Sequence, residues 1–207
     1  MNRKPGTKLL SMAAGLTLLG GIAAAQIDYS PVSNDDVLNP PAEDWLMWRG
    51  TLDNHGFSPL DQINRDNVDD LQLAWAWPMP VSGLQEVAPL VRDGIMFLGH
   101  NRNVVEALDA RTGDLIWEYR HPLRELEGGY HDYQADRQKN TIALYEDAVV
   151  LTTADAKIVV LEADSGQVRW ETEVNDYEKG YSYTAGPLVV NDTIFTGTSG
   201  CSITGTN

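Results

Sequence analysis

Short apolar runs, each bounded by a polar turn, fill most of the chain after residue 45. The runs are rich in Val, Ile, Thr and aromatic residues, a composition typical of β-strands. Turn-forming pairs such as Asp93-Gly94 and Asn191-Asp192 separate successive runs, as they do in β-hairpins. Only residues 58–71 indicate a helix, of roughly a turn and a half. The pattern therefore predicts an all-β protein.

One of these runs is repeated. ALDARTGDLIW (107–117) returns as VLEADSGQVRW (160–170), with glycine in the turn and tryptophan in the strand that follows. Each unit holds four runs in roughly 40–50 residues, the period of a β-propeller blade. We expect the tryptophan of each outer strand to pack on the neighbouring blade, with the turn glycine allowing close approach. Trp75 resembles an earlier docking tryptophan that has no such turn.

The chain is predicted to contain three segments. Residues 1–25 combine a basic start, an apolar middle and a run of alanines before Gln26, which predicts a cleaved signal peptide and export; the alternative is a membrane anchor. Residues 26–44 are polar and predict an extended lead-in. Residues 45–207 would form about two to three blades, fewer than the four to eight of a closed ring. We therefore interpret the chain as the N-terminal part of a longer protein.

The charge restricts the partners. The chain has 30 acidic and 15 basic residues and a formal net charge of −15. Nucleic acid and anionic membrane surfaces both require a basic face, so neither is expected as a partner. The acidic surface serves either solubility or the docking of a basic partner. No membrane span is expected once the signal peptide is removed, and a single cysteine excludes an internal disulfide framework.

The repeat and the segment DWLMWRGTLDNHGFSPLDQINRDNVDDLQLAW (44–75) resemble the quinoprotein alcohol dehydrogenases. These are eight-bladed propellers that use pyrroloquinoline quinone (PQQ), and the similarity covers residues 44–201. It implies a periplasmic enzyme that oxidises an alcohol to an aldehyde or ketone and passes electrons to a cytochrome c-type acceptor. The alternative is a non-catalytic propeller scaffold of the bacterial cell envelope, since such scaffolds carry the docking motif too.

The resemblance also implies cofactor contacts. It nominates Glu86 in QEVAPLV, Thr184 in YSYTAGPLVV, and Ser199, Gly200 and Cys201 in TSGC. A glycine suits this place because a flat, charged tricycle needs close backbone approach. The alternatives are a solvated strand-end acid for Glu86, a turn-capping hydroxyl for Thr184 and a buried small apolar residue for Cys201.

Three positions depart from the family pattern. Gln134-Ala135 stands where the best-known members have two adjacent cysteines, and Asn140 stands where they have an arginine. Arg137 or Lys139 could supply that charge. Ser202 replaces the family's calcium-binding glutamate, and a hydroxyl is a poorer Ca²⁺ ligand than a carboxylate. Calcium is still the expected metal, with its ligands unassigned.

The family's catalytic aspartate and metal-binding asparagine do not lie in this sequence, so the catalytic residues stay unassigned and residues 26–207 alone are expected to be inactive. No two of the four histidines have the spacing of metal ligands, and all four are expected in exposed loops. They are His55, His100, His121 and His131. Residues 127–139 are expected to form a loop over the face of the propeller.

Overall fold

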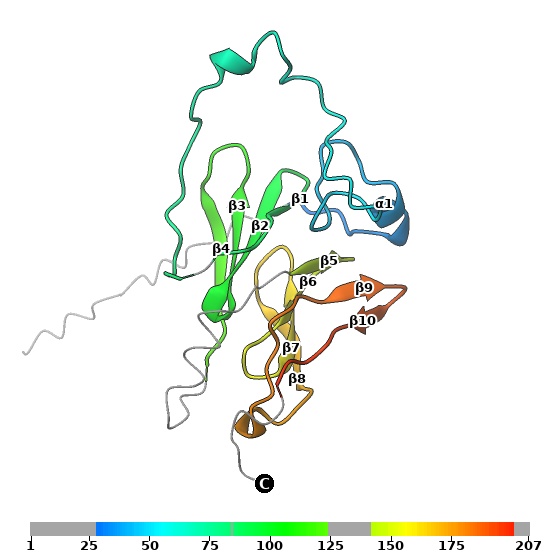
Figure 1. The fold of residues 1–207 in the computed structure, drawn as a ribbon, viewed down its shortest axis with the longest axis vertical. Helices are drawn as coiled ribbons and strands as arrows, with labels where there is room; N and C mark the ends of the chain where they lie inside the picture. The colour runs from blue at the N-terminus through cyan, green and yellow to red at the C-terminus, as the bar shows by residue number, and fades with distance from the viewer. Residues whose placement is uncertain (1–27, 84, 124–141, 201–207) are drawn as a thin grey trace, which may run out of the picture.

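The computed structural model describes residues 28–83, 85–123 and 142–200 (Figure 1). Several predictions fall outside these residues and stay predictions. They concern the signal peptide, the loop 127–139, Gln134-Ala135, Asn140, His131, Cys201 and Ser202.

Two four-stranded antiparallel sheets and one hairpin follow each other along the chain (Figure 1). The first sheet, blade 1, contains β1 (Leu90–Arg92), β2 (Ile95–His100), β3 (Val104–Asp109) and β4 (Leu115–Arg120) in sequence order. Blade 2 contains β5 (Ala143–Tyr145), β6 (Ala148–Thr152), β7 (Lys157–Glu162) and β8 (Val168–Glu173). The hairpin β9 (Leu188–Val190) and β10 (Thr193–Phe195) begins a third blade. The all-β, blade-repeat prediction is confirmed.

The hairpin turns adopt the backbone that their residues favour. Asp93 and Gly94 have φ of 52° and 74°, and Asn191 and Asp192 have 46° and 59°. Two consecutive left-handed residues match the twist of the flanking strands, and Asn, Asp and Gly accept this conformation most easily. These turns fix the register of the β1–β2 and β9–β10 hairpins.

Helical structure is scarce in the described residues. The lead-in, expected to be extended, contains α1 (Asn34–Leu38), whose first turn is capped reciprocally by Ser33 and Asp36. The expected helix over 58–71 is reduced to the 3-10 turn η1 (Val68–Asp70). None of the helices in residues 28–83, 85–123 and 142–200 is long and apolar enough to cross a membrane.

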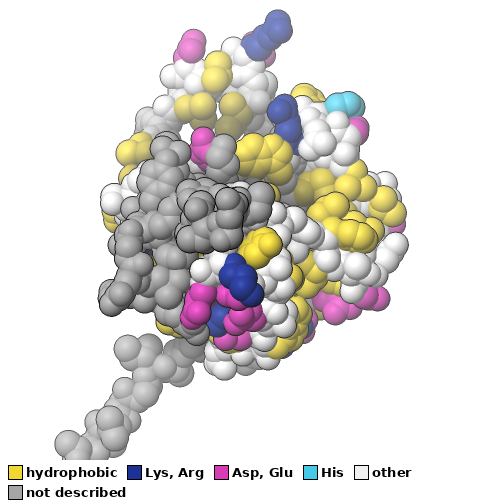
Figure 2. Space-filling model, turned by 60° about the horizontal axis from the view of Figure 1, so that its bottom comes forward, with side chains coloured by type: hydrophobic (Ala, Val, Ile, Leu, Met, Phe, Trp, Pro, Cys, Tyr) yellow, Lys and Arg dark blue, Asp and Glu magenta, His cyan; other side chains and the backbone are white. Residues whose placement is uncertain are grey.

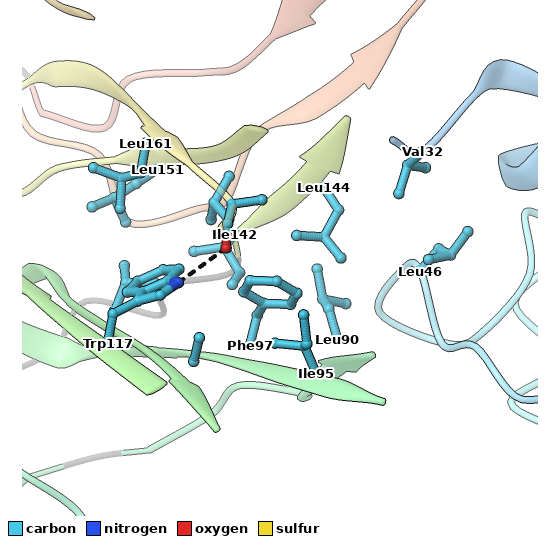
Figure 3. Packing of buried hydrophobic residues seen from close by; sticks show 14 of the residues in the cluster. Val32, Leu46, Leu90, Ile95, Phe97, Trp117, Ile142, Leu144, Leu151 and Leu161 are labelled. Carbon is cyan, nitrogen blue, oxygen red and sulfur yellow. Dashed lines mark hydrogen bonds between the residues drawn. The ribbon is translucent and has the colours of Figure 1, made fainter. Parts of the chain in front are cut away.

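Two of the three docking tryptophans, Trp75 and Trp117, pack as expected. The Trp117 indole points from blade 1 into blade 2, where its Nε1 donates to the Ala163 carbonyl at 2.9 Å (Figure 3). A Cβ added to Gly166 would lie 2.5 Å from the Trp117 ring. Trp75 repeats the arrangement one blade earlier, since its Nε1 donates to the Ala110 carbonyl at 3.1 Å. The glycine is therefore required by the neighbouring indole as well as by the turn.

The main core lies between blades 1 and 2. Phe97 of β2 and Leu151 of β6 are fully buried on facing sheets, and Trp117 closes the space between them (Figure 3). Val32 of the lead-in and Leu46, just after it, extend this core. Burying a side chain of this size contributes roughly 1.5–3 kcal/mol, so the interface between blades stabilises both sheets.

The lead-in is fastened by a buried ion pair. The Arg92 guanidinium at the end of β1 donates to Asp44 at 2.7 Å and to the Ser30 carbonyl at 3.1 Å. Both side chains of the pair are nearly inaccessible, with exposures of 9% and 3%. The lead-in is therefore part of the folded body rather than a tether.

Large apolar side chains remain open on the described surface, and Figure 2 shows such side chains gathered on one face. The third docking tryptophan, Trp170 of β8, is 42% exposed, whereas Trp117 at the equivalent place is 8% exposed. Leu188 and Phe195 of the third hairpin are about half exposed. The side chains at the equivalent positions of blade 1 are buried, because blade 2 packs against them.

Candidate functional site

Four of the nominated residues, Glu86, Thr184, Ser199 and Gly200, are described, and they lie at one edge of the blades, here called the site edge. In blade 1, β1 and β3 begin at this edge and β2 and β4 end there, because Val104 pairs with both His100 and Arg120. Blade 2 is arranged in the same way, with Thr152, Ile158 and Thr172 paired across its sheet. The loops that connect successive blades leave and enter at the site edge.

Thr184, Ser199 and Gly200 are brought together there. The Thr184 hydroxyl donates to Ser199 Oγ at 3.3 Å, and the backbones of Ser182 and Ser199 exchange two hydrogen bonds of 2.9 and 2.8 Å. Gly200 has a φ of 110°, and a Cβ at this position would overlap the carbonyl oxygen of Gly180. Two hydroxyls and a stretch of backbone without a side chain thus form a small polar surface.

Glu86 occupies the corresponding place on blade 1. It lies four residues before the start of β1, as Thr184 lies four residues before the start of β9. Both are followed by a Pro-Leu pair that enters the first strand of its blade. The repeat therefore places both residues at the site edge, and the Glu86 side chain is exposed there.

Two histidines at this edge are buried, so the expectation that they are exposed loop residues is wrong. His100 is fully buried and its Nε2 lies 2.8 Å from the Glu106 carboxylate, which also accepts from Trp77 Nε1 at 3.1 Å. Burial lowers the pKa of His100 because the charged ring is poorly solvated there. The sequence feature that could have indicated the burial of His100 is Glu106. A single acidic residue in an apolar strand needs a buried hydrogen-bond partner.

His121 forms the second buried pair. Its Nε2 lies 2.9 Å from Asp155 of blade 2, and its Nδ1 lies 3.0 Å from the Tyr119 hydroxyl. Burial alone would raise the pKa of Asp155, but the hydrogen bond and charge of His121 outweigh it and hold this pKa below its ordinary value. His55, by contrast, is exposed as expected.

Two cavities border the site edge. An apolar one of about 490 Å³ lies between the lead-in and the first strands of the blades, and its lining includes Trp48, Leu90 and Ala185–Val189. The other, of about 440 Å³, is lined by Asp155, Glu173, Asp176 and Glu178 together with Lys157. The acidic side chains outnumber the one lysine, so this lining disfavours an anionic ligand.

Residues 45–203 match the family model described as the glucose/ethanol/alcohol dehydrogenase β-propeller domain, named for PQQ. The chain belongs to this family. Among curated relatives, the quinoprotein alcohol dehydrogenase PedH of Pseudomonas putida is 34% identical over 97% of this chain. The quinoprotein ethanol dehydrogenase of Pseudomonas aeruginosa is 30% identical over 91% of it. The chain spans about a third of the length of these relatives, 33% and 30% respectively.

Solved structures of PQQ-family propellers have the same fold. A europium-containing methanol dehydrogenase is similar with a TM-score of 0.71 and 30% identity, over 81% of this chain and 30% of its own. The quinohemoprotein alcohol dehydrogenase ADHIIG from Pseudomonas putida HK5 gives a TM-score of 0.72 at 28% identity, over 83% and 25% of the two chains. The prediction of a partial propeller of this family is confirmed.

The described part of the site fits the organic cofactor of the PQQ family. The Thr184 hydroxyl donates to Ser199 Oγ and the Ser199 hydroxyl to the Ser182 carbonyl, and either hydroxyl can rotate to donate to a carboxylate or carbonyl of a ligand. Gly200 lacks a Cβ because the Gly180 carbonyl packs against it. Residues 28–83, 85–123 and 142–200 contain no group of three or more His, Cys, Asp or Glu that could hold a metal ion. The hydroxyls of Thr184 and Ser199 are therefore chemically compatible with PQQ.

Proposed function

We propose that this chain is the N-terminal part of a PQQ-dependent alcohol dehydrogenase that oxidises an alcohol to an aldehyde or ketone. The observation that carries the proposal is the cluster of Thr184, Ser199 and Gly200. This cluster lies at the site edge, where Glu86 also lies. Membership of a family whose relatives are named quinoprotein alcohol and ethanol dehydrogenases supports it.

When bound, PQQ supplies the quinone that accepts the electrons of the alcohol. This chain's residues bind and orient the cofactor. The Thr184 and Ser199 hydroxyls would turn to donate to its oxygens, and Gly200 would bring the backbone next to it without an intervening side chain. The exposed Glu86 carboxylate accepts a hydrogen bond from its ring system. Proton abstraction from the alcohol is left to residues outside this sequence.

We further propose that the protein is exported to the periplasm and passes electrons to a cytochrome c-type acceptor. The basic, then apolar, then alanine-rich order of residues 1–25 supports export. A relative named a quinohemoprotein alcohol dehydrogenase supports a haem acceptor. Calcium is proposed as the metal, held by residues outside the described part of the chain.

The first test is reconstitution of the protein at its full natural length. Apoprotein is mixed with PQQ and Ca²⁺, binding is followed by quenching of tryptophan fluorescence, and alcohol-dependent reduction of a dye reports activity. We expect Glu86→Gln and Thr184→Val to weaken PQQ binding, and the exposed Glu43→Gln in the lead-in to leave it unchanged. A PQQ affinity in both variants equal to that of the wild type would contradict the assignment of the site.

The alternative is a propeller scaffold of the cell envelope that binds no cofactor. The same titration separates the two functions, because a scaffold would show no saturable quenching by PQQ at any metal concentration. Binding of PQQ without oxidation of any alcohol would instead place this protein among inactive members of the family.

A further inference from the structure

Two of the cofactor contacts of the proposed function, Glu86 and Thr184, lie on segments without regular secondary structure. Glu86 stands between the docking tryptophan Trp75 and the start of β1, and Thr184 stands between η3 (Tyr177–Lys179) and β9. Loops of this kind move more than strands, yet a rigid cofactor requires fixed distances between its contacts. Other residues must therefore hold the two segments in place.

Asn101 holds the first segment. This residue lies in η2 (Asn101–Asn103), the short turn between β2 and β3, and is 1% exposed. Its Nδ2 donates to the Ser82 carbonyl at 2.8 Å, and its Oδ1 accepts from Gln85 Nε2 at 3.1 Å. One buried amide thus binds on both its sides to the segment that carries Glu86, and Gln85 is the residue immediately before it.

Asn103 extends the same turn toward blade 2. It is fully buried, and its Oδ1 accepts from the Ala154 backbone N–H at 3.0 Å. Its own carbonyl accepts from the His121 N–H at 3.1 Å. Arg102 and Asn103 both have left-handed backbones, with φ of 59° and 56°. Because of this backbone, Asn101 faces the segment that carries Glu86 and Asn103 faces blade 2, although both belong to one three-residue turn.

The neighbours of Ala154 hold the second segment. The Thr152 hydroxyl donates to the Ala185 carbonyl at 2.8 Å, and the Thr153 carbonyl accepts from the Tyr183 N–H at 3.3 Å. These two bonds fix the residues on either side of Thr184. Hydrogen bonds joined by short stretches of backbone therefore connect Gln85, through η2 and the end of β6, to both sides of Thr184.

We propose that Asn101, Asn103 and Thr152 are positioning residues that set the separation between Glu86 and Thr184, and through it the affinity for PQQ. The inference rests on the proposed function, because the two contacts are contacts to PQQ. None of the three residues is assigned a contact to the cofactor or the alcohol. Their effect is transmitted through hydrogen bonds to the segments that hold it.

Two substitutions each remove one of these hydrogen bonds, and Thr152→Val does so with little change of shape. Asn103→Gly deletes the acceptor for Ala154 and tolerates the positive φ, and Thr152→Val replaces the hydroxyl by a methyl group within a strand. Asn103→Asp restores the acceptor and also tolerates the backbone. Two exposed residues of the third hairpin give the matched controls, Asn191→Gly with φ of 46° and Thr193→Val.

The experiment is a fluorescence titration of each full-length apoprotein with PQQ in the presence of Ca²⁺, with thermal unfolding of the same samples. We expect Asn103→Gly and Thr152→Val to raise the Kd for PQQ roughly 10- to 100-fold, the range for residues that orient a ligand-holding group. Both controls should bind as the wild type does, and Asn103→Asp should recover most of the loss. At saturating PQQ, the KM for alcohol should be unchanged.

Each other outcome has a distinct meaning. Wild-type protein that does not bind PQQ would contradict the proposed function and this inference with it. Wild type that binds, with Thr152→Val and Asn103→Gly equal to their controls in Kd, would refute the positioning role alone. If Asn103→Gly does not fold, Thr152→Val decides the result. A loss of thermal stability without a change in Kd would show a purely structural role.

Discussion

Gly166 offers a direct test of how the blades are joined. It has a φ of 67°, and a Cβ at this position would lie 2.5 and 2.7 Å from two atoms of the Trp117 indole. Gly166→Ala therefore perturbs the turn and the docking contact together. Gly94 is the matched control, because its φ is 74° and a Cβ there would meet nothing within 4 Å.

The magnitude follows from separating the two effects. An alanine forced into the left-handed region costs roughly 1–2 kcal/mol, and both variants carry this cost. In Gly166→Ala the indole must also move away from the turn. That displacement strains a packed core by roughly 1–3 kcal/mol and weakens the bond from Trp117 Nε1 to the Ala163 carbonyl. We therefore expect Gly166→Ala to lose about 1–3 kcal/mol more stability than Gly94→Ala.

Urea denaturation of the full-length protein, followed by tryptophan fluorescence, gives the free energy of unfolding of each variant. In a Trp117→Ala background the indole is absent, so Gly166→Ala should then cost no more than Gly94→Ala. Equal losses for the two glycine variants in the wild-type background would refute the docking argument, and so would an unchanged difference after Trp117 is removed.

Three further outcomes are expected. Trp117→Phe should lose roughly 1–3 kcal/mol of unfolding free energy in urea, because its backbone acceptor in blade 2 is left without a donor. Arg92→Ala should lose roughly 3–5 kcal/mol in the same assay, because Asp44 is then a buried, unpaired charge. Asp155→Asn should flatten the acid limb of the stability curve. The folded pKa of Asp155 lies below the ordinary 3.8, so its pairing with His121 stabilises above about pH 4 and is lost as the pH falls through the folded pKa. Unfolding measured from pH 2 to 7 checks this, and parallel curves for wild type and variant would contradict it.

The fold could be predicted from the sequence because the blade repeat is a local signal. Gly113 and Gly166, each followed by a tryptophan at the same distance, identify the turn and the docking strand without any long-range information. The lead-in was harder to predict. Its helix α1 depends on a single capping pair, Ser33 and Asp36, and its fastening depends on Arg92, which is 48 residues from Asp44 and 62 from Ser30. Composition indicated only a polar segment.

The site could be predicted in part. Glu86 and Thr184 were nominated by resemblance, and the repeat explains why both stand at the same edge. The buried partners His100 and His121 were misjudged, since each stands at the end of a strand and its burial depends on the blade packed beside it. Strand ends are exposed in an isolated hairpin and covered in a stack of blades, so sequence position alone does not fix their environment.

The stacking of the blades also determines how precisely Glu86 and Thr184 are placed relative to each other. Glu86 and Thr184 stand on the first and third blades, so their separation is the sum of two junctions between blades. Trp117 and Gly166 define the first junction, and a cluster around Tyr183 that includes Val150, Val160 and Val189 forms the second. Apolar packing sets the spacing of the sheets but leaves their loops free to shift. The hydrogen bonds of η2 cross the first of these junctions at the site edge, where the loops emerge. Docking tryptophans thus join the blades, and in the proposed site the bond of Asn103 to blade 2 and the bonds of Asn101 to Glu86's segment set the finer positions.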